Sequence, residues 1–127
     1  MIVVDASVAL AALLNAGPAR RALGSGQLHV PHLIDSEIAN GLRRGVAGGR
    51  IGADAGWAAL ATWQRLAMVR YPVFGILDRV WQLRDNLSAY DATYVALAEQ
   101  LDCPLVTVDR RLSRSPGLRC PITVLPR

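Results

Sequence analysis

Four acidic residues spread over almost the whole chain have the type and setting to do chemistry together. Asp5 and Asp109 each follow a short run of apolar residues, whereas Glu37 and Asp91 lie in segments with helical spacing of apolar residues. Carboxylates that converge repel one another, and a divalent cation relieves that repulsion. Because no His or Cys accompanies the acids, the set favours an oxygen-loving ion, Mg²⁺ or, as a substitute, Mn²⁺.

Ions of this kind activate water and orient phosphodiesters, so the acids predict hydrolysis of a phosphate ester by metal-activated water, without a protein nucleophile. Ser7 and Thr107 each lie two residues from one of the acids, Asp5 and Asp109. Their hydroxyls are expected to bond a carboxylate or a metal-bound water. The alternatives are a helix cap at Ser7 and an ordinary strand residue at Thr107.

Asp91 is the acid that structure alone explains least. Helical spacing puts it on the same face as Tyr94, Val95 and Ala98, and that apolar face is expected to point inward. A carboxylate there is costly unless it is paired or binds a cation. The alternative is an ordinary acid in the first turn of a helix, where the helix dipole favours a negative charge.

The other three acids have plainer alternatives. Asp5 and Asp109 could cap the elements that follow their strands. Glu37 could pair with Arg44 on the same helix, or be an ordinary acid at the boundary of the core. Glu37 is therefore the member of the set that sequence physics supports least.

Short apolar runs alternate with helical segments along the chain, which predicts an α/β fold with a mainly parallel sheet and helices on both faces. Strands are expected at Ile2 to Val4, Leu28 to Val30, Val69 to Tyr71, Leu105 to Val108 and Ile122 to Leu125. Helices are expected at Ser7 to Leu14, Pro18 to Leu23, Leu33 to Val46, Asp54 to Leu66, Val73 to Leu83 and Ala89 to Leu101. The apolar side of the Val73 to Leu83 helix is expected to carry Val73, Leu77, Val80 and Trp81. Such sheets bind ligands at the carboxyl ends of their strands, where Asp5 and Asp109 are placed.

Length and composition narrow the class of protein. A chain of 127 residues with 52% hydrophobic residues predicts one folded domain, residues 1 to 127. The chain holds 14 Arg, no Lys and 10 acids, and setting aside the four acids of the site leaves a surplus of 8 positive charges. That surplus fits a phosphate-rich partner; a merely soluble basic surface is the alternative.

The apolar runs are too short to cross a membrane, and the N-terminus lacks the basic segment of a signal peptide. We therefore expect a cytoplasmic protein. The two cysteines, Cys103 and Cys120, do not form a metal-ligand pattern and are expected to be buried thiols.

Each of the four acids lies in a distinct block of sequence. The blocks are Ile2-Val3-Val4-Asp5-Ala6-Ser7, Leu33-Ile34-Asp35-Ser36-Glu37-Ile38, Leu87-Ser88-Ala89-Tyr90-Asp91-Ala92-Thr93-Tyr94-Val95-Ala96-Leu97-Ala98 and Leu105-Val106-Thr107-Val108-Asp109. In this order and at this chain length they resemble a PIN-domain protein, specifically the VapC-type toxin of bacterial type II toxin–antitoxin pairs. The third block is the most specific, and the resemblance covers nearly the whole chain.

The resemblance implies a three-layer α/β/α sandwich and a Mg²⁺-dependent endoribonuclease that cleaves RNA. Asp5 and Asp91 correspond to the principal metal ligands, and Glu37 and Asp109 complete the cluster directly or through water. The small polar positions that support the cluster correspond to Ser7 and Thr107. The implied partners are an RNA substrate, a cognate antitoxin protein and, because VapC-type proteins are commonly homodimers, a second copy of the chain.

Two other classes of function remain to be weighed. A non-catalytic PIN-like module that binds RNA or a partner would not need the acid set, and the set is intact. A receiver or phosphotransfer domain also places acids at strand ends, but those folds typically use a Lys and this chain has none. The phosphatase pattern of two Asp around one residue also fails, because Ser7 stands at the position of the second Asp.

Six arginines occur as adjacent pairs: Arg20 and Arg21, Arg43 and Arg44, Arg110 and Arg111. The last pair follows Asp109 directly and could meet an RNA backbone, although a solvated surface is the plainer interpretation. Trp57 and Trp63 lie on one expected helix. Core packing is the first interpretation of these two side chains, and an antitoxin-binding groove is the alternative.

Overall fold

A five-stranded sheet positions every other element. The computed structural model describes residues 1–127, and its strands are all parallel in the order β3-β2-β1-β4-β5. The strands are β1 (Ile2–Val4), β2 (Leu28–Pro31), β3 (Val69–Tyr71), β4 (Leu105–Thr107) and β5 (Ile122–Val124). The predicted parallel sheet is therefore confirmed, and every expected strand is present.

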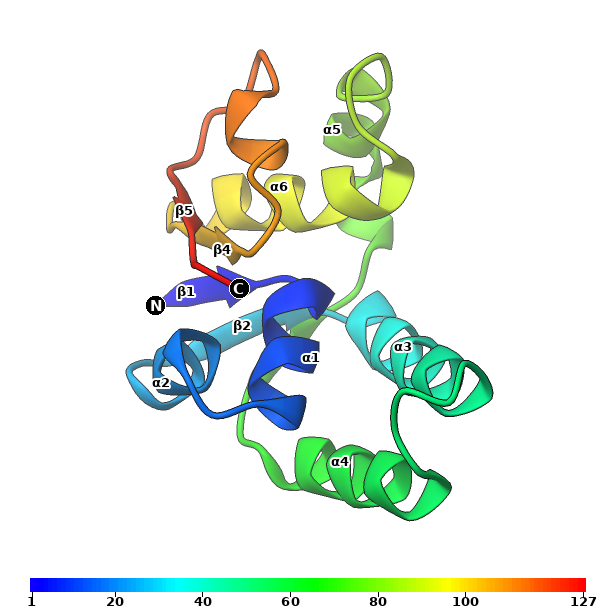
Figure 1. Cartoon of the computed structure of the whole chain (residues 1–127). Coiled ribbons are helices and arrows are strands. Elements are labelled where there is room, and N and C mark those ends of the chain that lie inside the picture. Colours follow the sequence, from blue (N-terminus) through cyan, green and yellow to red (C-terminus); the bar gives the residue numbers. More distant parts are fainter.

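Helices cover both faces of the sheet. They are α1 (Ala6–Leu14), α2 (Pro18–Gly24), α3 (Leu33–Ala47), α4 (Ala53–Arg65), α5 (Leu77–Gln82) and α6 (Ala89–Leu101), with 3₁₀ turns η1 (Phe74–Ile76) and η2 (Leu112–Arg114). Figure 1 shows α5 and α6 on one side of the sheet and α1, α2 and α4 on the other. This arrangement is the α/β/α sandwich that the resemblance implied. None of the helices combines the length and apolar character that a membrane crossing requires.

Small side chains let α6 lie close against the sheet. Its residues 92–98 are all buried, and the helix contacts β1, β2 and β4. The opposite face is covered by α1, whose Val8, Ala9 and Ala12 are buried. Because both faces are covered, the central strands read as continuous apolar runs rather than as alternating patterns.

The order of the strands creates a crevice at one edge of the sheet. From β1 the chain passes through α1 and α2 to β2 on one side, whereas β4 lies on the other side of β1. In doubly wound sheets ligands bind at this switch point, outside the carboxyl ends of the strands. Helices that connect parallel strands run back across the sheet, so α6 begins at the same edge, and α3 starts directly after β2.

Two expected boundaries were wrong. Pro31 was expected to stop the second strand, but it pairs with Tyr71, because the N–H of the next residue, His32, continues the ladder to the Tyr71 carbonyl at 2.8 Å. The expected helix from Val73 to Leu83 is divided into η1 and the short α5. A 3₁₀ turn has fewer residues per turn than an α-helix, which rotates the face that follows it.

The rotation changes which side chains of this segment are buried. Ile76, Val80 and Leu83 face the core, whereas Leu77 and Trp81, expected on the apolar side, are 47% and 67% exposed. The sequence pattern was therefore correct about a helical segment and wrong about its inward face.

Asp35 joins three elements on the side of the sheet that carries α4. Its carboxylate accepts hydrogen bonds from Arg70 Nε of β3 at 2.8 Å and from Trp63 Nε1 of α4 at 2.7 Å. The Arg70 guanidinium is the main reason that the pKa of Asp35 lies below its ordinary value. Trp63 is thus a buried core residue, as first expected, whereas Trp57 is 66% exposed and is not.

Candidate active site

The four acids from separate blocks of the sequence line one pocket at the carboxyl edge of the sheet. Asp5, Glu37, Asp91 and Asp109 all border this pocket, which has a volume of about 470 Å³. Ser7 also lines it. The parallel topology explains the convergence, because strand ends and the starts of returning helices meet at this edge.

Asp5 follows β1 and is the N-cap of α1. Its Oδ1 accepts hydrogen bonds from the Val8 N–H at 3.1 Å and from the Ser7 hydroxyl at 2.5 Å. The capping interpretation is therefore correct for Asp5, but it uses only one carboxylate oxygen. Oδ2 accepts no hydrogen bond from the protein, so it is available to a ligand in the pocket.

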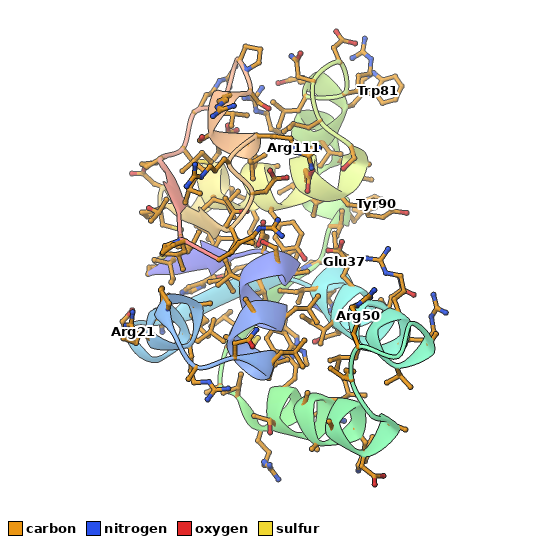
Figure 2. All side chains as sticks on the ribbon, viewed as in Figure 1. Arg21, Glu37, Arg50, Trp81, Tyr90 and Arg111 are labelled. Atoms are coloured by element: carbon orange, nitrogen blue, oxygen red, sulfur yellow. The ribbon has the colours of Figure 1, made fainter.

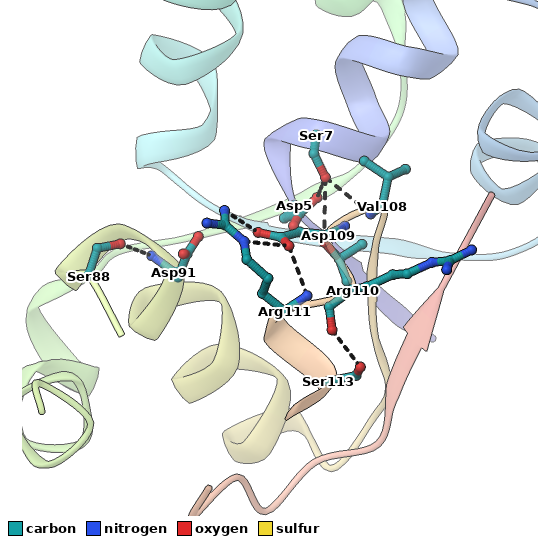
Figure 3. Close-up of polar contacts among 10 residues, drawn as sticks. Asp5, Ser7, Ser88, Asp91, Val108, Asp109, Arg110, Arg111 and Ser113 are labelled. Atoms are coloured by element: carbon teal, nitrogen blue, oxygen red, sulfur yellow. Dashed lines mark hydrogen bonds and ion pairs between the residues drawn. The ribbon is translucent and has the colours of Figure 1, made fainter. Parts of the chain in front are cut away.

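Two hydroxyls join the end of β4 to the start of α1 (Figure 3). Ser7 Oγ accepts a hydrogen bond from the Val108 N–H at 3.2 Å and lies 3.5 Å from Thr107 Oγ1. Thr107 is fully buried, and its Oγ1 accepts a hydrogen bond from the Asp109 N–H at 3.0 Å. Ser7 thus bonds a carboxylate, as expected, whereas Thr107 fixes the backbone from which Asp109 projects.

Asp91 is more exposed than the helical pattern predicted. Tyr94, Val95 and Ala98 are buried as expected, but Asp91 lies in the first turn of α6, where the helix has not yet passed beneath the sheet. The Ser88 hydroxyl caps this turn by accepting the Asp91 N–H at 3.1 Å.

The pKa of Asp91 is nevertheless raised. Partial burial of its carboxyl in the pocket is the main cause, and the charges of Asp5 and Asp109 add to it, while Arg111 and Ser88 oppose it. The acids of the pocket therefore sense one another electrostatically.

Glu37 is held by a residue that the sequence did not single out for chemistry. The Tyr94 hydroxyl donates a hydrogen bond to Glu37 Oε1 at 2.5 Å, and Glu37 makes no ion pair with Arg44. Burial chiefly raises the pKa of Glu37, the charges of Asp91 and Asp5 raise it further, and the Tyr94 bond lowers it. A hydroxyl on an apolar helix face, one turn after Asp91, was the only sequence signal for this contact.

Asp109 is the one acid of the pocket that forms an ion pair with an arginine. Arg111 donates to its two oxygens from Nε at 3.1 Å and from Nη2 at 3.0 Å, and the Arg111 N–H also bonds it at 2.9 Å. The Arg111 side chain holds the pKa of Asp109 below its ordinary value. Because that guanidinium is 88% exposed, the ion pair is weak and exchangeable.

The donor set fits a hard divalent cation. All the ionisable side chains that converge on the pocket offer oxygen, apart from Arg44, and two of the carboxyls have a pKa raised partly by their neighbours' charges. No three His, Cys, Asp or Glu side chains gather closely enough to hold an ion among themselves. Mg²⁺ does not need a closer cluster, because it usually binds one or two carboxylates and keeps several waters.

Comparisons with known proteins agree with the fold. The family described as the PIN domain matches residues 2–118. Ribonuclease VapC9 of Mycobacterium tuberculosis is 63% identical over 127 residues, with all of both chains covered. The crystal structure of Mycobacterium tuberculosis VapC20, a Sarcin-Ricin loop cleaving toxin, has a TM-score of 0.67 at 22% identity, covering 94% of this chain and 97% of that one. A toxin–antitoxin complex from Klebsiella pneumoniae has a TM-score of 0.65 at 19% identity, covering 98% and 100%.

At such low identities the two solved structures show the fold alone. The family match and the full-length similarity to VapC9 show more: the chain belongs to the PIN-domain family and, within it, to the VapC ribonucleases, which are metal-dependent enzymes. The resemblance noted in the sequence is thereby confirmed.

The raised pKa of Asp91 predicts an effect on stability. The stability linked to this carboxyl is fully present below its ordinary pKa of 3.8 and is lost as pH rises through the higher folded value. Asp54→Asn is a matched control, because Asp54 is also an exposed acid in the first turn of a helix, α4. We expect Asp91→Asn to raise the free energy of unfolding at pH 7 by about a few tenths of a kcal/mol more than Asp54→Asn does. The difference is small because solvent partly screens the Asp91 carboxylate.

Urea unfolding at pH 7 and at about pH 3, below the ordinary pKa of 3.8, measures this difference. The advantage of Asp91→Asn is expected to disappear at the lower pH, where the carboxyl of the unsubstituted chain binds a proton. Equal effects of the two substitutions at pH 7 would show that neither burial nor the neighbouring acids destabilise the Asp91 carboxylate.

Proposed function

We propose that this chain is the toxic component of a type II toxin–antitoxin pair and acts as a Mg²⁺-dependent endoribonuclease. The observation that carries the proposal is the convergence of four carboxylates on one pocket, two of them with a pKa raised by burial and by the charge of their neighbours. The similarity to VapC9 supports the ribonuclease activity.

Asp5 and Asp91 are proposed as the principal ligands of the ion. Asp5 offers an oxygen that accepts no hydrogen bond from the protein, and Asp91 lines the same pocket from the first turn of α6. Glu37 and Asp109 complete the set, directly or through water. When bound, Mg²⁺ supplies an activated water and stabilises the leaving oxygen of the phosphodiester.

The remaining groups orient these ligands. Ser7 fixes one oxygen of Asp5, Thr107 fixes the backbone of Asp109, and Tyr94 fixes one oxygen of Glu37. Burial and the Glu37 charge raise the pKa of Tyr94 so far that the phenol keeps its proton and remains a donor. Precise support of this kind commonly matters to metal affinity.

Substitution of the principal ligands tests the activity. Asp5→Asn and Asp91→Asn are expected to reduce RNA cleavage in Mg²⁺ by roughly 100-fold or more, on the scale of removing one major electrostatic contribution to catalysis. EDTA should abolish cleavage by the unsubstituted chain, and Asp54→Asn should leave it intact. Mapped ends of cleaved cellular RNA provide the measurement.

Undiminished cleavage by either variant would refute the proposed ligand set. RNA binding by the unsubstituted chain that weakens with salt, with no cleavage in Mg²⁺ or Mn²⁺, would instead favour the alternative of a non-catalytic PIN-like module that binds RNA or a partner.

We also propose a cognate antitoxin as partner and a homodimer as assembly, on the basis of the VapC family and of the fold shared with the Klebsiella complex. Expression of the chain alone should arrest growth, and co-expression of the neighbouring open reading frame should restore it. Light scattering of the purified chain should give the mass of two copies. Normal growth without the neighbour, or the mass of one chain, would contradict the respective proposal.

A further inference from the structure

One basic residue faces the acidic pocket without a partner. Arg44 is the only Arg, Lys or His among the residues that line it. None of the three ion pairs in the chain involves Arg44, and its side chain makes no hydrogen bond with the protein. Arg111, the other guanidinium near the acids, is already bound by Asp109. Arg44 is therefore the basic residue of the pocket wall whose guanidinium holds no carboxylate and can bind an anionic ligand.

The helical spacing of α3 and its packing against α1 place Arg44 at the pocket. Glu37, Asn40, Gly41 and Arg44 all line the pocket, and their spacing places them along one face of the helix. At Gly41 a Cβ atom would lie 2.5 Å from Leu10 Cδ1, so the Leu10 side chain of α1 packs directly against this position of α3. Glu37 lies on the same face but makes no ion pair with Arg44, and its Oε1 accepts the Tyr94 hydroxyl.

The opposite wall of the pocket carries an exposed aromatic ring. Tyr90, in the first turn of α6, lines the pocket and is 65% exposed. Figure 2 shows it projecting outward from α6 on the side of the molecule where Glu37 lies. An exposed ring at the rim of a charged pocket offers a platform on which a planar group can stack.

We propose that Arg44 and Tyr90 position the RNA on the two sides of the acids: Arg44 binds a backbone phosphate and Tyr90 stacks on an unpaired base. The guanidinium matches a phosphate in charge and in geometry. A base can reach an aromatic side chain only where it has left the helical stack, so stacking on Tyr90 requires an unpaired nucleotide beside the pocket. This inference rests on the proposed ribonuclease function and adds the groups that hold its substrate.

Binding of a fluorescent single-stranded RNA to chains that carry Asp91→Asn, across a series of salt concentrations, tests the proposal without cleavage. In this background Arg44→Ala should weaken binding severalfold and reduce the slope of log affinity against log salt by about 0.7, the loss of one phosphate contact to a single strand. Arg43→Ala is the matched control, because Arg43 is adjacent and exposed but lies outside the pocket and bonds only Asn40.

Tyr90→Ala should weaken binding by about 5-fold or more without changing the salt slope, since stacking involves no phosphate charge. Tyr90→Phe keeps the ring and should restore most of the binding. Trp57→Ala, which removes an exposed aromatic residue outside the pocket, is the control for loss of an exposed ring. Thermal melting of each variant checks that the fold is retained.

Equal affinities and salt slopes for Arg44→Ala and Arg43→Ala would overturn the role of Arg44. Failure of Tyr90→Phe to bind better than Tyr90→Ala would overturn stacking on Tyr90, and so would an affinity for duplex RNA equal to that for single-stranded RNA. These outcomes differ from failure of the proposed function, in which the unsubstituted chain itself neither cleaves nor binds RNA.

Discussion

Repulsion among four carboxylates is the constraint on which the rest of this structure depends. Three of the four acids are held by a neighbouring side chain: Asp5 by Ser7, Glu37 by Tyr94 and Asp109 by Arg111. The Asp91 carboxylate forms no ion pair and is positioned by the first turn of α6. The unrelieved part of the repulsion contributes to the raised pKa of Glu37 and Asp91, which is why a divalent cation is the natural complement of the site.

The packing of the sheet allows the fold to tolerate this concentration of negative charge. Its central strands are buried on both faces, and an α6 rich in small residues packs tightly against them. Away from the pocket, Asp35 joins α3, α4 and β3 through Arg70 and Trp63. The acids consequently project from elements whose positions are set by packing elsewhere. The fold therefore does not depend on the active site for its stability.

Much of this arrangement could be predicted from the sequence. Short apolar runs that end in Asp5 and Asp109 indicate strand ends, and parallel topology brings strand ends together. The exposure of Asp91, the inward face of α5 and the Tyr94 contact could not be predicted, because each depends on where a helix enters or leaves the sheet. Helical spacing defines faces, whereas tertiary packing decides which face is buried and which hydroxyl meets which acid.

The pKa values of Glu37 and Asp91 test the central claim most directly. Carbon-13 NMR of the side-chain carboxyls across a pH titration measures them in the metal-free chain and again with Mg²⁺. We predict that both lie above their ordinary values of 4.5 and 3.8 without the ion, and that both fall when Mg²⁺ is added. Ordinary values in the metal-free chain, or values that do not respond to Mg²⁺, would contradict a site built on carboxylate repulsion and its relief by a cation.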